Sequence, residues 1–170
     1  DAPLWGPQDE VVVSPSKVDT VTTCALRWAF ESAGGTAPDA THQTLGTLVH
    51  SLAEEHPAAP LSVLRAELDR PWPELAVPEG WPSRQLRRRA EEMVARLAEY
   101  YQDSGEPVLV EPAFDLTLGR ARLRGKIDRV ESDGEDAVTV ADLKTGRSAP
   151  SKDKAAENPQ LGAYQLAVAE

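Results

Sequence analysis

Cysteine is almost absent from this sequence, because Cys24 is the only one among 170 residues. A lone thiol cannot form a disulfide within the chain, and by itself it cannot hold a zinc ion or an iron–sulfur cluster. We expect a buried thiol. Also missing are a run of about 18 apolar residues, which a membrane-spanning helix needs, and a basic-then-apolar start of the signal-peptide kind. A cytoplasmic protein with no membrane partner is therefore the expectation.

Positive charge is scarce overall, since the formal net charge is −10. This argues against a nucleic-acid partner, because lysine and arginine drive phosphate binding. The distribution weakens that argument. Residues 1–80 hold 12 acidic and 4 basic side chains, whereas residues 81–170 hold 16 and 14. A short stretch whose only acidic residue is Asp128 contains five cations: Arg120, Arg122, Arg124, Lys126 and Arg129.

Apolar residues at helical spacing predict three helices in the first two thirds of the chain. The first covers about Pro15 to Glu31, and the second carries the Leu45–Ala53 stripe. The third is one that Ser83 could cap and that ends before Gly105. Residues 56–82 are rich in proline, and we interpret them as an irregular, mostly helical insertion with a short helix near Leu61–Leu68.

Short alternating, β-branched runs follow Gly105 and predict a meander of three strands. They lie near Val108–Leu118, Arg120–Glu131 and Ala137–Lys144, and the chain becomes helical again from Pro159. This order predicts an α/β, or α+β, fold: a small central mixed sheet with an antiparallel meander, flanked by helices. We expect one domain over residues 1–170, as a fragment of a larger polypeptide.

The last two strands bring chemically interesting residues together. Asp142 and Lys144 are two apart on a strand and therefore share a face. Symmetric closure of the hairpin about Gly134-Glu135 would place Asp128 opposite Ala141, and a single bulge would align it with Asp142. Two carboxylates that close repel unless a cation binds between them, and hard oxygen ligands suit Mg²⁺ or Mn²⁺.

Such an ion can lower the pKa of a bound water and neutralise charge on a phosphate. Lys144 would stand beside that water or phosphate and stabilise the developing negative charge. A plain structural alternative remains open from these residues alone. Asp128 and Asp142 would then be solvated residues on a sheet face, and Lys144 their surface ion-pair partner.

Four ordered motifs carry a family resemblance. They are Gly46-Thr47-Leu48-Val49-His50, Gly125-Lys126-Ile127-Asp128-Arg129, Ala141-Asp142-Leu143-Lys144-Thr145-Gly146 and Gln160-Leu161-Gly162-Ala163-Tyr164. From about Ser14 to Glu170 the sequence resembles the RecB-like nuclease domains of the PD-(D/E)xK superfamily, as in the RecBCD, AddAB and AdnAB helicase–nucleases. The resemblance implies a restriction-endonuclease-like core.

The resemblance also implies roles for matching residues. His50, Asp128, Asp142 and the main-chain carbonyl of Leu143 would bind the metal, and Lys144 would be the catalytic lysine. Gln160 and Tyr164, one helical turn apart, would contact the DNA strand. Taken alone, His50 could simply pack at a helix edge and Tyr164 could be a core aromatic.

Glu54 and Glu111 are weaker candidates for additional or indirect metal ligation. We favour a solvent-facing role for Glu54 and leave Glu111 open. Some members of the family carry an iron–sulfur cluster with one cysteine in the first helical segment, where Cys24 lies. Because Ala25 replaces the usual following proline, we favour Cys24 as a core residue over a cluster ligand. The arginines at 84 and 87–89 are followed by Glu91 and Glu92, which favours a solvated, ion-paired surface with no site role.

These features predict a Mg²⁺- or Mn²⁺-dependent deoxyribonuclease, an exonuclease that could also cut within single strands. The resemblance implies single-stranded DNA ends as substrate, a helicase motor in the same or a partner polypeptide, and a place in processing double-strand breaks for recombinational repair. One alternative is a stand-alone RecB-like exonuclease. Another, from a different class, is a nuclease-fold module that binds DNA or a partner without cutting.

Overall fold

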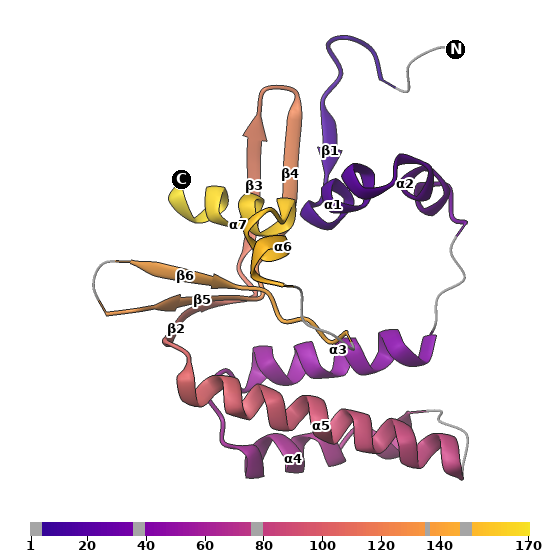
Figure 1. Ribbon diagram of the computed structural model, residues 1–170, viewed down its shortest axis with the longest axis vertical. Helices are drawn as coiled ribbons and strands as arrows, with labels where there is room; N and C mark the ends of the chain where they lie inside the picture. Colours follow the sequence, from indigo (N-terminus) through magenta and orange to yellow (C-terminus); the bar gives the residue numbers. More distant parts are fainter. Residues whose placement is uncertain (1–4, 36–39, 76–79, 135–136, 147–150) are drawn as a thin grey trace. The chain divides into compact units, whose positions relative to one another are not determined.

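The computed structural model describes residues 5–35, 40–75, 80–134, 137–146 and 151–170 (Figure 1). The chain divides into two units. The first comprises Asp1–Ala37, Glu111–Ile127 and Ser148–Glu170, and the second comprises Pro38–Val110 and Asp128–Arg147. Among the described residues, no helix combines the length and apolar character needed to cross a membrane.

The first unit is a small mixed sheet with helices. Its elements are β1 (Val11–Val13), α1 (Pro15–Thr23), α2 (Ala25–Ser32), β3 (Ala113–Leu118), β4 (Ala121–Lys126), α6 (Lys152–Ala156) and α7 (Pro159–Ala169). The strand order is β1-β4-β3, with β1 parallel and β3 antiparallel to β4. Gly119, with φ 61°, begins the two-residue turn between β3 and β4, as a type II′ hairpin turn requires.

The second unit combines helices with an antiparallel sheet. Its elements are α3 (Ala40–Glu55), α4 (Leu61–Asp69), the short 3₁₀ helix η1 (Trp72–Glu74), α5 (Trp81–Asp103), β2 (Glu106–Val110), β5 (Arg129–Ser132) and β6 (Val138–Ala141). The strand order is β2-β5-β6. Small mixed and antiparallel sheets flanked by helices confirm the predicted fold class.

The hydrophobic core of the second unit lies where α3, α4 and α5 pack together (Figure 1). The apolar stripe predicted on α3 is buried, with Leu45 only 1% exposed. The short helix expected in the proline-rich segment is α4, and its Leu64 and Leu68 are fully buried one turn apart. Residues 61–69 therefore contribute side chains to the core.

The helix predicted over Pro15–Glu31 is divided into α1 and α2 at Cys24. Cys24 has extended dihedral angles and caps both helices: its main-chain N–H bonds to Thr20 and its sulfur accepts from the Arg27 N–H. The preceding Thr20–Thr23 segment is β-branched throughout and has low helix propensity. The hydroxyls of Thr20 and Thr22 also bond back to main-chain carbonyls of α1.

The three predicted strands correspond to five shorter strands in the structure, β2 to β6. The first is broken by Glu111 and Pro112, because proline has no N–H for the ladder. The second is broken between Lys126 and Arg129. Strand β1 was not predicted, since three residues give too short a pattern. Helix α5 starts at Trp81 after Gly80, so the predicted Ser83 cap is wrong, but its end before Gly105 is confirmed.

A buried polar network in the second unit surrounds Arg129. Arg129 and Glu131 are 2% and 3% exposed and form an ion pair on β5. The guanidinium also bonds to the Pro57 carbonyl and lies 4.8 Å from the centre of the Tyr101 ring. The Tyr100 hydroxyl donates to Glu131 at 2.7 Å. The network ties β5 to α5 and to the segment that follows α3.

Two neighbouring tyrosines should respond oppositely to loss of the hydroxyl. Tyr100→Phe removes a hydrogen bond to a buried carboxylate and should lower the free energy of unfolding by roughly 1.5–3 kcal/mol. The Tyr101 hydroxyl is buried without a hydrogen-bond partner among the described residues. Tyr101→Phe should therefore leave stability unchanged or raise it. Urea unfolding of both variants measures this, and equal losses would contradict the assignment.

Stability should also decline in alkaline solution. Burial raises the pKa of Tyr101 to about 12, and burial together with its bond to Glu131 raises the pKa of Tyr100. An unfolded tyrosine has a pKa of about 10. The stability that the two protonated tyrosines contribute is therefore complete below that pH and is lost as pH rises towards their folded pKa values. The urea midpoint should therefore fall above about pH 10, and less steeply in Tyr101→Phe.

Candidate metal centre

Three acidic residues directly flank strands β2, β5 and β6: Glu111 follows β2, Asp128 precedes β5 and Asp142 follows β6. Val110 of β2 pairs with Arg129 of β5, which pairs with Ala141 of β6. One residue beyond each of these paired positions come Glu111, Asp128 and Asp142. The strand register thus places three carboxylates, which are distant in the sequence, at the same end of neighbouring strands.

The observed register corrects the predicted one. The sequence was expected to pair Asp128 with Ala141 and to need a bulge to align Asp128 with Asp142. In the structure Arg129 pairs with Ala141, so the hairpin is shifted by one residue and no bulge between β5 and β6 is required. Glu135 of the expected turn lies outside the described residues, but the register itself shows the difference, because a one-residue change in a turn changes every pair that follows.

Asp128 is held firmly. Its Oδ2 accepts a hydrogen bond of 2.6 Å from the Leu143 main-chain N–H, and its Oδ1 lies 3.8 Å from His50 Nδ1. The side chain of Asp128 is 13% exposed. The segment that follows β6, at Leu143, and helix α3, at His50, therefore both approach the Asp128 carboxylate.

His50, Glu111 and Asp128 form a group suited to a cation. Each offers one ligand atom, and these atoms all lie within 4.8 Å of one another. Two carboxylates and one imidazole suit a divalent metal such as Mn²⁺, and oxygen-rich sites also suit Mg²⁺. The donor chemistry therefore fits the expected ion. Asp142 lies outside this group, although it follows Ala141 in the same register.

Glu111 has an unusual backbone. Its φ of 50° lies in the left-handed region, which is uncommon for residues other than glycine. Such conformations cost of order 1 kcal/mol and cluster at functional sites. Glu111 Oε2 also lies 3.7 Å from Lys126 Nζ. The sequence left the role of Glu111 open, and its one signal there is the place of Glu111 before Pro112, which interrupts a strand.

Asp142 and Lys144 form an ion pair. Lys144 Nζ lies 2.5 Å from Asp142 Oδ2, with side chains 49% and 8% exposed. The plain structural alternative anticipated an ion pair, but it also required solvated carboxylates. The low exposure of Asp142 does not fit that requirement. The catalytic role of Lys144 and the metal ligation by Asp142 and the Leu143 carbonyl stay predictions.

The segment after Asp142 packs against two helices. Leu143 joins the core of the second unit, and an Arg89 N–H donates to the Thr145 carbonyl at 3.4 Å. A β-carbon on Gly46 would lie 3.1 Å from Thr145 Oγ1, so glycine permits this approach. Gly46 and His50 share a face of α3. The G-x-x-x-H motif thus combines a close packing position with a candidate ligand.

The arginine cluster on α5 is mainly an ion-paired surface, as expected. Arg87 pairs with Asp69 and Glu91, and Arg88 pairs with Glu92. Arg89 is the exception, because it contacts Thr145 directly after the candidate catalytic lysine. This contact was not predicted, because no local sequence pattern indicates a hydrogen bond between residues 56 positions apart.

Gln160 and Tyr164 lie on α7 of the first unit. The Gln160 amide bonds to the Tyr164 hydroxyl at 2.7 Å, which confirms that they share a face. Tyr164 is 5% exposed and packs edge-on against Phe114, with ring centres 5.9 Å apart. It therefore serves as a core aromatic; contact of this pair with DNA stays a prediction.

Cys24 is exposed, so its predicted place in the core is wrong. It lies at the junction of two helices, and the adjoining α2 has no buried residue. Nothing in the structure tests the iron–sulfur alternative. Glu54 is exposed, as predicted.

Comparison with known proteins identifies a family for the chain. The family model of the PD-(D/E)XK nuclease superfamily matches residues 12–170, which include all four motifs and Glu111. No curated protein matches the chain. Because the family model covers nearly the whole sequence, the chain belongs to the PD-(D/E)XK nuclease superfamily.

Proposed function

We propose that the chain is a Mg²⁺- or Mn²⁺-dependent deoxyribonuclease whose metal centre comprises His50, Glu111, Asp128 and Asp142. The observation that carries this proposal is the convergence of His50, Glu111 and Asp128 at one strand edge in a member of a nuclease superfamily. A divalent ion there would lower the pKa of a bound water and neutralise charge on the scissile phosphate.

The chain's own residues supply orientation and charge. The Leu143 N–H donates a hydrogen bond to Asp128 Oδ2, and Asp128 Oδ1 faces His50. Lys144 places a positive charge beside Asp142 while remaining half-exposed. In our proposal this ammonium orients the attacking water and stabilises the negative charge that develops on the phosphate.

The finer assignment is a RecB-type nuclease. We infer from the four motifs that the chain cuts single-stranded DNA ends delivered by a helicase motor during break repair. Gln160 and Tyr164 would then contact the strand. A stand-alone exonuclease of the same type is the alternative within this class.

A cleavage assay tests the proposal. The full chain is incubated with single-stranded DNA, labelled at either end, with Mg²⁺, with Mn²⁺ or with a chelator. We expect cleavage with metal and none with chelator. Lys144→Ala should slow cleavage by roughly 10²–10³-fold, as removal of one transition-state donor does. The matched control is Lys152→Ala, an exposed lysine on α6, which should cleave at the normal rate.

Product lengths from the two labels distinguish exonuclease from endonuclease action. Uncut DNA with both metals, from a chain shown to be folded, would contradict catalysis. If that chain still bound DNA, the non-cutting binding module would be the better description.

A further inference from the structure

Strand β4 presents a row of cations on one face. Arg122, Arg124 and Lys126 alternate along the strand with Leu123 and Gly125, so the two sets point to opposite faces. Leu123 is 7% exposed, and a β-carbon on Gly125 would lie 3.2 Å from atoms of Phe114 and Pro15. One face of β4 is therefore packed within the first unit.

The cationic face of β4 is open. The side chains of Arg122, Arg124 and Lys126 are 38%, 59% and 57% exposed. Val12, paired with Arg122 across the parallel strands, is 54% exposed. Nothing among the described residues of this unit covers the row.

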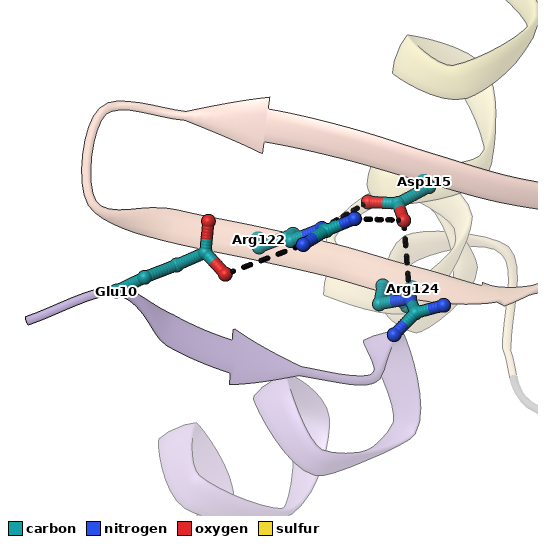
Figure 2. A network of polar contacts seen from close by, with 4 residues as sticks. All are labelled: Glu10, Asp115, Arg122 and Arg124. Atoms are coloured by element: carbon teal, nitrogen blue, oxygen red, sulfur yellow. Dashed lines mark hydrogen bonds and ion pairs between the residues drawn. The ribbon is translucent and has the colours of Figure 1, made fainter.

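Figure 2 shows how the two arginines are held. Arg122 Nε and Nη2 each lie 2.7 Å from an oxygen of Asp115, and Arg124 Nε lies 3.1 Å from Asp115 Oδ2. Glu10 is further from Arg122, at 3.5 Å. Hydrogen bonding to Arg122 lowers the pKa of Asp115, so that carboxylate stays ionised. One carboxylate thus occupies the two guanidinium groups together.

These contacts can be exchanged for phosphate. Exposed ion pairs contribute little to stability, and a guanidinium binds phosphate with the same two-pronged geometry that it uses for a carboxylate. The row is linear, with side chains on alternate residues about 6.6 Å apart at a rise of about 3.3 Å per residue. The chain continues from Lys126 through Ile127 directly to Asp128 of the metal centre.

We infer that Arg122, Arg124 and Lys126 on the exposed face of β4 bind the phosphate backbone of single-stranded DNA. This inference rests on the proposed function, because it supplies a binding surface for that substrate. Although the net charge of the chain is −10, the row gathers three cations on one strand, where phosphate can replace their carboxylate partners Asp115, Glu10 and Glu111. Contacts to phosphate carry no sequence information, so binding should be independent of sequence.

Equilibrium binding of a fluorescent oligothymidine to the full chain, with chelator to prevent cleavage, tests the inference. The double variant Arg122→Gln/Arg124→Gln should bind at least about tenfold more weakly at low salt. The slope of log affinity against log salt should become shallower by about 1.4, at about 0.7 for each phosphate contact on a single strand. The matched control is Arg27→Gln, which removes an exposed arginine of the Arg27–Glu31 pair in the same unit and should change neither value.

Asp115→Asn gives a second and opposite prediction. Removing the carboxylate that competes with phosphate should tighten binding several-fold, whereas Glu31→Gln should have no effect. Weaker binding by Asp115→Asn, an unchanged salt slope in the double-arginine variant, or no binding by the unaltered chain at low salt would each overturn the inference. Cleavage by the unaltered chain is scored separately, so failure of this surface leaves the proposed nuclease standing.

Discussion

Asp128→Asn should reduce metal-dependent cleavage by on the order of 10³-fold or more. An ion at the active site stabilises the transition state by several kcal/mol, and each 1.36 kcal/mol is tenfold in rate. Asp128 is central because its carboxylate meets His50, Glu111 and the Leu143 N–H together. Asparagine keeps the shape and an acceptor for Leu143 but loses the charge. Initial cleavage rates, with Mn²⁺ affinity from calorimetry, measure both losses.

The control for this variant is Asp133→Asn, an exposed aspartate next to the β5–β6 turn. It removes the same charge from the same hairpin and should cleave and bind Mn²⁺ normally. Cleavage by Asp128→Asn above one tenth of the normal rate, with an unchanged melting temperature, would show that Asp128 is not the central ligand.

Arg129→Met should be the most destabilising single change in the second unit, at roughly 3–5 kcal/mol. It leaves Glu131, which is 3% exposed, without the cation that compensates its buried charge. It also removes the bond to the Pro57 carbonyl and the contact with Tyr101. Urea unfolding with fluorescence detection measures the loss.

A double variant distinguishes the effect of an uncompensated buried charge from the effect of lost packing. Arg129→Met/Glu131→Met removes both charges and should recover much of the stability, because apolar side chains often replace buried ion pairs without loss. Arg88→Met, at an exposed ion pair of α5, should change stability by less than about 1 kcal/mol. A single-variant loss no larger than that of Arg88→Met would contradict the structural role of the network.

Much of the fold could be predicted from the spacing of apolar residues along the sequence. The Leu45–Ala53 stripe and the Leu61–Leu68 helix depend on spacing within one element, and both are observed. The errors occur where one residue interrupts a pattern. Cys24 divides a helix and Pro112 ends a strand, and neither changes the apolar period around it.

The candidate metal centre could be predicted from the sequence less completely than the fold. Sequence motifs singled out His50 and Asp128, and the structure brings these together. Glu111 joins them only because β2 pairs with β5, and this pairing sets positions roughly 20 residues apart side by side. The backbone strain at Glu111 is likewise invisible in the sequence.

By itself the sequence determined the kinds of residue available for chemistry and the alternation that puts Arg122, Arg124 and Lys126 on one face of a strand. Only the tertiary structure decided that Arg129, from the same cationic stretch, is buried with Glu131 while the other three remain exposed. It also decided the register, in which Arg129 pairs with Ala141 and the next residues outward are Asp128 and Asp142. Periodicity arises from neighbours along the chain, whereas burial and register arise from contacts between distant segments.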